Sequence, residues 1–146
     1  MVSGDVVRQY GKRPRTTLSP TLVARDGEPY LALGTPGGDQ QDQWTLHVFL
    51  RHVHSGLDLQ AAIDAPEHHT EAFPSSFYPR ATRARHVAVE DRIGDATIDG
   101  LRARGHDVEV TAAWSLGRVS VVGREADGQL KAGANPRGMQ GYAVGR

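Results

Sequence analysis

Residues 21–50 read TLVARDGEPYLALGTPGGDQQDQWTLHVFL, and this stretch decides the fold. Two β-prone runs, 21–24 and 30–33, flank the turn residues Asp26-Gly27, which predicts a β-hairpin. The second run stops at Gly34, and a Thr-Pro-Gly-Gly turn follows before a helical pattern begins. The stretch therefore predicts strand, turn, strand, glycine turn and helix in succession.

The predicted helix has apolar residues at i, i+3, i+4, i+7 and i+11, the spacing of one helical face. These residues are Leu46, Phe49, Leu50, Val53 and Leu57. Asp39 or Asp42 could cap its start, and Gly56 is well placed to end it.

Further along the chain, hairpins alternate with helices. DLQAAIDAP predicts a short helix between an Asp58 N-cap and Pro66, and residues 67–85 are loop-like. HVAVED predicts a strand, and residues 94–110 predict a helix, a Gly105 C-cap and a second strand. A second hairpin is expected around Asp127-Gly128, and GYAVG is a candidate edge strand. Strands that come mainly as hairpins favour an α+β fold over an all-parallel sheet.

Length and composition exclude several functional classes. The 146 residues suit one domain, expected over residues 11–146 after a polar lead-in at residues 1–10. The formal net charge is zero, so nothing draws the chain generally to nucleic acid or to an anionic membrane. Cysteine is absent, which excludes disulfides and thiol chemistry but assigns no compartment. No apolar run approaches the roughly 20 residues that span a bilayer.

The glycine pair Gly37-Gly38 has three possible explanations. Glycines relieve steric crowding in a tight turn, and they let a backbone approach a ligand closely. Successive N–H groups at a helix start also suit an anion, or an oxyanion that forms during acyl transfer. The pattern matches neither a phosphate loop nor G-x-G-x-x-G. From the residues alone, the tight turn, the anion cradle and the oxyanion hole all stay open.

Two other groups could carry chemistry. The hydroxyls of Thr16 and Thr17 could bind a substrate, although such residues more often satisfy turns and strand ends. The pair His68-His69, with Glu67 and Glu71 nearby, could bind a metal. No cysteine or well-spaced third ligand completes a set, so we predict no metal or other cofactor.

Taken together, these motifs resemble the γ-glutamyltransferase (γ-glutamyltranspeptidase) superfamily of N-terminal-nucleophile hydrolases. The resemblance rests on GKRPRTTLSPTLVARDGEPYLALGTPGGDQQDQ, DLQAAIDAPEHH, LRARGHDVEV and GQLKAGANPRGMQGYAVG, and it covers nearly the whole chain from Gly11. It implies part of an αββα sandwich, with antiparallel hairpins packed against helices.

The resemblance also implies roles for individual residues. In this superfamily a precursor cleaves itself, and the newly N-terminal threonine attacks a γ-glutamyl carbonyl to form an acyl-enzyme. By match, Gly37 and Gly38 would donate N–H groups to the oxyanion, and Thr16 and Thr17 would contact the substrate. The family more usually has Ser-Ser at that pair. GGDQQDQW also departs from the usual Gly-Gly-Ser-Arg, and it looks more like the acylase-like branch, which leaves glutathione in doubt as the substrate.

The family's nucleophile segment has no counterpart among the residues before Gly11. The chain therefore looks like the C-terminal part of a small subunit. We expect it to expose apolar surface and to need a partner, either a missing N-terminal segment with the large subunit or a second copy of itself. The alternative is a non-catalytic binding or oligomerisation module derived from this family.

Overall fold

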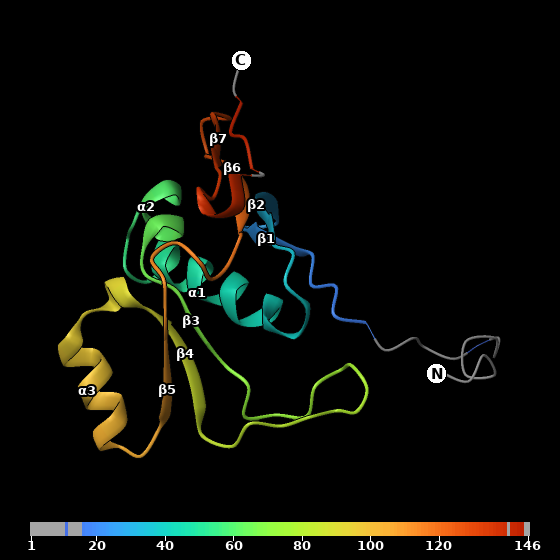
Figure 1. Ribbon diagram of the computed structural model, residues 1–146. Coiled ribbons are helices and arrows are strands. Elements are labelled where there is room, and N and C mark those ends of the chain that lie inside the picture. The colour runs from blue at the N-terminus through green and yellow to red at the C-terminus, as the bar shows by residue number, and fades with distance from the viewer. Residues whose placement is uncertain (1–10, 12–15, 140, 145–146) are drawn as a thin grey trace.

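A computed structural model describes residues 11, 16–139 and 141–144 of the chain. The predicted lead-in at residues 1–10 lies outside the described residues. The strands are β1 (Thr21–Arg25), β2 (Glu28–Gly34), β3 (His68–Thr70), β4 (His86–Glu90), β5 (Asp107–Thr111), β6 (Ser120–Arg124) and β7 (Leu130–Gly133). The helices are α1 (Gln41–Val53), α2 (Leu59–Asp64) and α3 (Asp95–Ala103), with the short 3-10 turns η2 (Gly38–Gln40), η3 (Asp91–Ile93) and η4 (Arg137–Met139). The fold is α+β, as predicted (Figure 1).

Both predicted hairpins belong to one four-stranded antiparallel sheet, ordered β1-β2-β6-β7. Asp26 and Gly27 both have positive φ, at 53° and 86°, which is the geometry of a two-residue hairpin turn. The hairpin predictions are therefore confirmed. The candidate edge strand GYAVG is wrong for its described part, because residues 141–144 form no strand.

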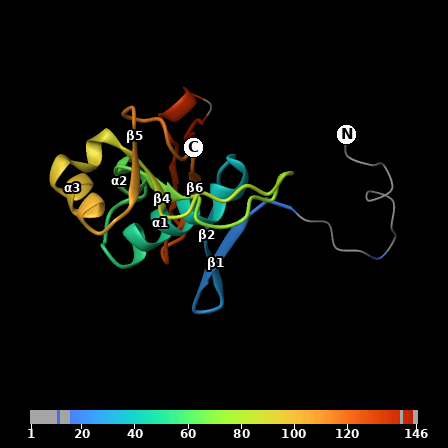
Figure 2. The ribbon, with the colours of Figure 1, turned by 60° about the horizontal axis from the view of Figure 1, so that its bottom comes forward.

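The second sheet has three strands in the order β3-β4-β5. β4 and β5 run parallel and are connected through α3, so antiparallel hairpins do not account for the whole fold. β3 lies in the stretch that the sequence marks as loop, because its three residues are too few to show a periodicity. Helix α1 lies between the two sheets, and α3 packs on the far side of β5 (Figures 1 and 2).

The core forms where α1 and α2 cover one face of the four-stranded sheet. Its buried side chains are Tyr30, Leu31, Leu33, Trp44, Val48, Leu59, Ala62, Ile63, Val119 and Val121. The buried residues of α1 are Gln41, Trp44, Thr45 and Val48, which is not the row that the apolar spacing selects. Of that row, Phe49 packs against the core, whereas Leu46 and Val53 are 52% and 42% exposed. The prediction of one apolar face is therefore only partly right.

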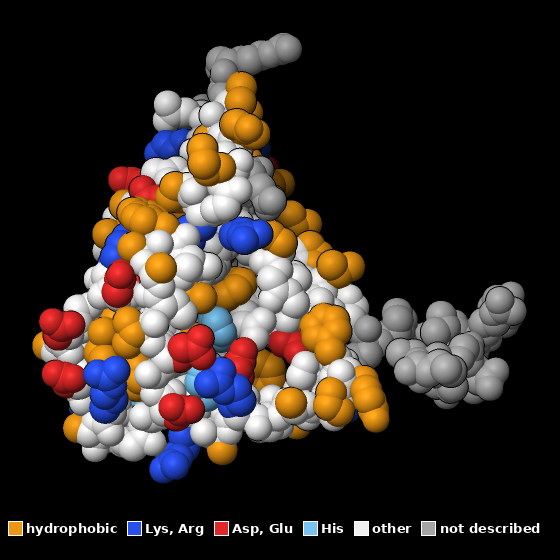
Figure 3. Space-filling model, viewed as in Figure 1, with side chains coloured by type: hydrophobic (Ala, Val, Ile, Leu, Met, Phe, Trp, Pro, Cys, Tyr) orange, Lys and Arg blue, Asp and Glu red, His pale blue; other side chains and the backbone are white. Residues whose placement is uncertain are grey.

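No described helix or strand covers the other face of the four-stranded sheet. Strand register places Leu22, Ala32, Val122 and Ala132 in one row across it. Leu22 is 85% exposed and Val122 is 56% exposed. In Figure 3, hydrophobic side chains gather over the end of the molecule where β6 and β7 lie and over the 71–85 loop. Exposed apolar patches are typical of surfaces that contact a partner, a membrane or a ligand.

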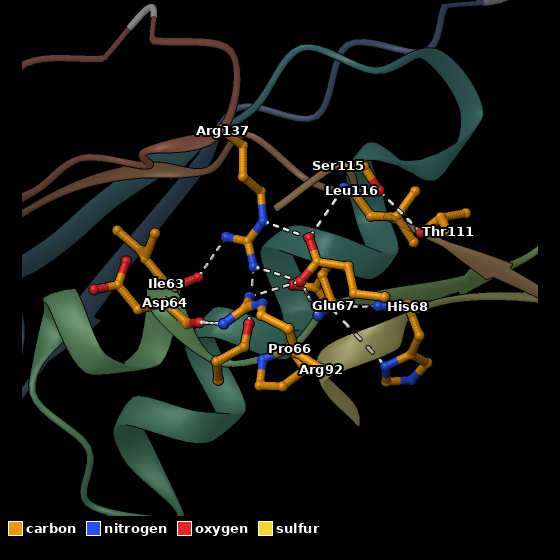
Figure 4. A network of polar contacts seen from close by, with 12 residues as sticks. Ile63, Asp64, Pro66, Glu67, His68, Arg92, Thr111, Ser115, Leu116 and Arg137 are labelled. Carbon is orange, nitrogen blue, oxygen red and sulfur yellow. Dashed lines mark hydrogen bonds and ion pairs between the residues drawn. The ribbon is translucent and has the colours of Figure 1, made fainter. Parts of the chain in front are cut away.

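A buried carboxylate joins the two sheets. Glu90, at the end of β4, is fully buried and accepts hydrogen bonds from Arg137 (2.8 Å) and Arg92 (2.7 Å). The backbone N–H groups of Leu116 and Glu67 also donate to it. Figure 4 shows the side chains of Arg137 and Arg92 pointing toward one another. Burial alone would raise the pKa of Glu90, but these donors outweigh it and lower the pKa to about 2.

Within the described residues, no helix combines the length and apolarity that crossing a membrane requires.

Candidate active site

The glycine turn joins β2 to α1, and its backbone conformation favours glycine at both positions. Gly37 has φ 140° and Gly38 has φ 66°, both in the region that L residues rarely adopt. A Cβ on Gly37 would lie 2.2 Å from Cζ3 of the buried Trp44. A Cβ on Gly38 would lie 3.4 Å from the ring of Phe77. The turn is therefore packed against an indole ring from α1, and a phenyl ring from the 71–85 loop lies beside it.

Gln41 connects this turn to the threonine segment. Its side chain is only 7% exposed. In the amide orientation that satisfies its neighbours, Nε2 donates to the carbonyl oxygens of Thr17 and Thr35, both at 3.1 Å, and Oε1 accepts from Gly38 N at 3.2 Å. One side-chain amide thus holds Thr17 and Gly38 in a single backbone cluster.

The two threonine hydroxyls differ in their contacts. Thr16 Oγ1 accepts from Leu18 N at 3.0 Å, a local turn contact of the kind expected for a structural role. The Thr17 hydroxyl forms no hydrogen bond to the other described residues, while its carbonyl is held by Gln41. Thr17 is therefore better placed than Thr16 to offer its hydroxyl to a ligand.

Neither predicted cap, Asp39 nor Asp42, closes the start of α1, whose N-cap is Gln40 without a side-chain bond. Asp42 instead pairs with the Ser19 hydroxyl. Asp39 Oδ2 accepts from Ser76 N at 2.7 Å and from the Ser75 hydroxyl at 3.0 Å. Neither aspartate caps the helix, because both carboxylates cross-link the helix start to other segments. Asp39 in particular ties the 71–85 loop to the glycine turn.

His47, Glu67 and His68 form one group of ligand-type side chains whose ligand atoms lie within 4.8 Å of one another. The third ligand-type residue is His47 on α1, which the sequence spacing did not indicate. The Glu67 carboxylate is already engaged, however, by His47 Nδ1 at 2.6 Å and by Arg51 at 3.1 Å. The two imidazole rings are stacked with an interplanar angle of 18°, so their in-plane lone pairs run side by side instead of converging. We interpret the group as a buried carboxylate held by hydrogen-bond donors. The absence of a metal remains a prediction.

The paired histidines face different surroundings. Burial, with nearby His47, lowers the pKa of His68. Burial also lowers the pKa of His69, whose ring meets Trp44 edge-on at a centroid distance of 5.4 Å. Strand β3 therefore contacts the glycine turn indirectly. His69 packs against the Trp44 ring, and that ring lies next to Gly37.

Sequence reasoning missed Gln41 as a functional candidate. The signal was present, because a glutamine three residues after a residue at a helix start can reach back to its backbone N–H, as in a capping box. It was hidden because Gly38 is not a serine or threonine. Trp44 was also missed, since only the structure brings an indole ring beneath Gly37.

A sequence profile described as gamma-glutamyltranspeptidase matches residues 7–145. The chain is 33% identical over 136 residues to the glutathione hydrolase-like YwrD proenzyme of Bacillus subtilis, a match that covers 92% of this chain and 25% of that protein. The curated relatives are much longer, since the chain spans from 12% to 25% of the length of those compared.

Solved structures show the same relationship. One named LmbA2991HD is 57% identical with a TM-score of 0.87, covering 93% of this chain and 24% of that one. The γ-glutamyltranspeptidase of Pseudomonas nitroreducens, complexed with L-DON, is 25% identical with a TM-score of 0.73, covering 99% of this chain and 70% of that one. A cephalosporin acylase of Bacillus halodurans is 27% identical with a TM-score of 0.72, covering 86% and 22%.

Proposed function

Because the chain belongs to the γ-glutamyltranspeptidase family, we propose that it supplies the oxyanion hole and part of the substrate contacts of an amide hydrolase or acyltransferase. In this proposal Gly37 and Gly38 donate their N–H groups to the oxyanion, and Thr16 and Thr17 contact the substrate. The nucleophile is a threonine on a segment that this chain does not contain.

The observation that carries the proposal is the clamped glycine turn at the start of α1. Both glycines are fixed in positive φ, and Gln41 holds Gly38 beside Thr17. An oxyanion hole works because its donors are oriented before the reaction begins, and loss of one donor typically costs about 10²–10³-fold in rate. The contacts of the turn with Trp44 and Gln41 support the proposal, because they orient its backbone before any substrate binds.

The proposed reaction is acyl transfer through a covalent intermediate. The threonine hydroxyl adds to the amide carbonyl, its proton passes to the threonine's own α-amine, and the carbonyl oxygen becomes an oxyanion facing Gly37 and Gly38. Collapse of this intermediate reforms the carbonyl and breaks the C–N bond, while the α-ammonium returns its proton to the leaving nitrogen, so that a neutral amine is released. Water or another amine then takes the acyl group from the threonine.

We propose a γ-glutamyl or related acyl amide as the substrate, with glutathione not favoured. Asp39 stands where the glutathione-cleaving pattern has serine, and it draws the 71–85 loop toward the turn. The loop places the Phe77 ring beside Gly38, so an apolar wall borders the proposed oxyanion site. Such a wall suits an acyl amide with an apolar group near the scissile bond.

We also propose that the chain works with a partner, either the nucleophile-bearing segment with its large subunit or a second copy of itself. The support is the uncovered apolar row on the four-stranded sheet. The same surface favours the alternative function, a non-catalytic oligomerisation module, which would use the row without using the glycine turn.

The test compares two proteins on a panel of γ-glutamyl and other acyl anilides. One is the 146-residue chain alone, and the other is this chain together with a nucleophile-bearing segment. We expect turnover only in the second, and a large loss of that turnover on substitution of Gly37. Turnover by the chain alone, sensitive to Gly37, would show that the nucleophile lies within it. Failure of the complete protein on every anilide would favour the module.

A further inference from the structure

Gln41 touches both halves of the proposed site with one buried amide. Its Nε2 is bound to two carbonyl oxygens, those of Thr17 and Thr35, each at 3.1 Å. Its Oε1 is bound to Gly38 N at 3.2 Å. The side chain therefore occupies one of the two N–H groups that the proposed function assigns to the oxyanion.

The hydrogen bond from Gly38 N–H to Gln41 Oε1 is weak enough for an oxyanion to replace it. The acceptor is a neutral amide oxygen, and 3.2 Å is at the long end for an N–H···O bond. Hydrogen bonds to an ionised acceptor are roughly twice as strong as bonds between neutral groups. An alkoxide that forms near Gly38 would therefore take over this donor, and the amide oxygen would swing away from Gly38 while Nε2 keeps its bonds to Thr17 and Thr35.

We propose that Gln41 is a positioning residue that keeps the Gly38 N–H oriented and hydrogen-bonded. The oxyanion of the tetrahedral intermediate then replaces the Gln41 side-chain oxygen as the acceptor. The inference rests on the proposed function, because it assigns Gly38 as an oxyanion donor. The amide is needed at this position because a carboxylate offers no donor to Thr17 or Thr35 and would hold the Gly38 N–H as tightly as the oxyanion does.

The test uses the complete enzyme, with the nucleophile-bearing segment, and the variants Gln41→Glu and Gln40→Glu. Gln40 lies at the same helix start, with its side-chain oxygen 3.9 Å from where a Cβ of Gly38 would lie, so its variant adds the same charge nearby without that hydrogen bond. We expect Gln41→Glu to lower kcat by about 100-fold while KM changes by less than about threefold. Affinity for an alkylboronic acid, whose adduct carries a tetrahedral oxyanion, should fall in step with kcat. Gln40→Glu should lose clearly less than Gln41→Glu in each quantity, because its carboxylate does not take the Gly38 N–H.

A second experiment tests the hydrogen bond between Gly38 N–H and Gln41 without catalysis, on the 146-residue chain. Hydrogen exchange at the Gly38 amide, followed by NMR, should be about tenfold faster in Gln41→Met than in wild type or Gln40→Glu. Thermal melting of each variant separates these effects from loss of folding.

The outcomes distinguish the inference from the proposed function. An inactive wild-type enzyme would overturn the proposed function, whatever Gly38 does. An active enzyme in which Gln41→Glu and Gln40→Glu lose the same activity would overturn the role of Gln41. Equal protection of Gly38 in all three chains would overturn the contact itself.

Discussion

Gly37 and Gly38 are adjacent, but different neighbours constrain them. Beyond its positive φ, Gly37 faces the Trp44 ring, which a Cβ would overlap at 2.2 Å. Gly38 faces the edge of Phe77 at an ordinary contact distance of 3.4 Å. We predict that Gly37→Ala destabilises the fold by about 2–5 kcal/mol through backbone strain and overpacking. Gly38→Ala should cost about 1–2 kcal/mol through strain alone. Urea unfolding of both variants measures the two losses in the free energy of unfolding. A larger loss for Gly38→Ala than for Gly37→Ala would contradict the prediction.

Glu90 makes stability depend on acid pH. Its pKa is lowered from 4.5 to about 2, so its contribution is complete above pH 4.5 and is lost as the pH falls from 4.5 toward 2. We predict that Glu90→Gln lowers the free energy of unfolding at neutral pH by about 3–5 kcal/mol, because Arg137 and Arg92 lose a buried partner. The unfolding curves of variant and wild type should converge toward pH 2.

The control for that prediction is Glu125→Gln, which removes a surface pair with Lys131. The free energy of unfolding of this variant should stay close to that of wild type at both neutral and acid pH, because solvent screens an exposed pair. A Glu90→Gln deficit that is the same at pH 2.5 and pH 7 would show that the ionised carboxylate is not what holds the junction.

At the scale of elements, the 71–85 loop depends on Asp39. The Asp39 carboxylate accepts from Ser75 and Ser76 and so holds Phe77 near Gly38. We predict that Asp39→Ala raises the rate of tryptic cleavage at Arg80 by about tenfold, because the loop opens locally without global unfolding. Asp42→Ala is the matched control, since Asp42 contacts Ser19 instead of the loop. Equal cleavage in the two variants would contradict the tether.

Most elements could be predicted from the sequence because they carry strong local signals. Asp26-Gly27 and Asp127-Gly128 fix two hairpins, and Asp58 caps α2 by accepting from Ala61 N at 2.8 Å. Short or tertiary features could not be predicted. Three residues of β3 show no period, and the parallel pairing of β4 with β5 is a property of the whole sheet.

The candidate site was predictable in part. The sequence selected Gly37-Gly38 by composition, but the clamp by Trp44 and the link by Gln41 depend on tertiary packing. The apolar spacing of α1 pointed to Leu46 and Val53, yet the helix buries Gln41, Trp44 and Val48. A helix that is apolar on two sides gives an ambiguous pattern, because one side can face the core and the other a partner.

At the scale of the whole molecule, the uncovered sheet face predicts association. The double variant Leu22→Lys/Val122→Lys places charges on the exposed apolar row without touching the core. We predict that the wild-type chain self-associates in sedimentation velocity and that the double variant does so less, with an unchanged circular dichroism spectrum. Ala103→Lys, on the exposed surface of α3, should behave as wild type. A monomeric wild-type chain that binds no hydrophobic dye would contradict the assignment of this face.

The central claim is that Gly37 and Gly38 stabilise charge created by a nucleophile from another segment. The most direct measurement is a crystal structure of the complete enzyme with an alkylboronic acid bound to its threonine. We predict a boronate oxygen about 3 Å from both the Gly37 and Gly38 nitrogens, with the Gln41 side-chain oxygen displaced from Gly38. A boronate oxygen held by other donors, more than about 4 Å from both glycine nitrogens, would contradict the account.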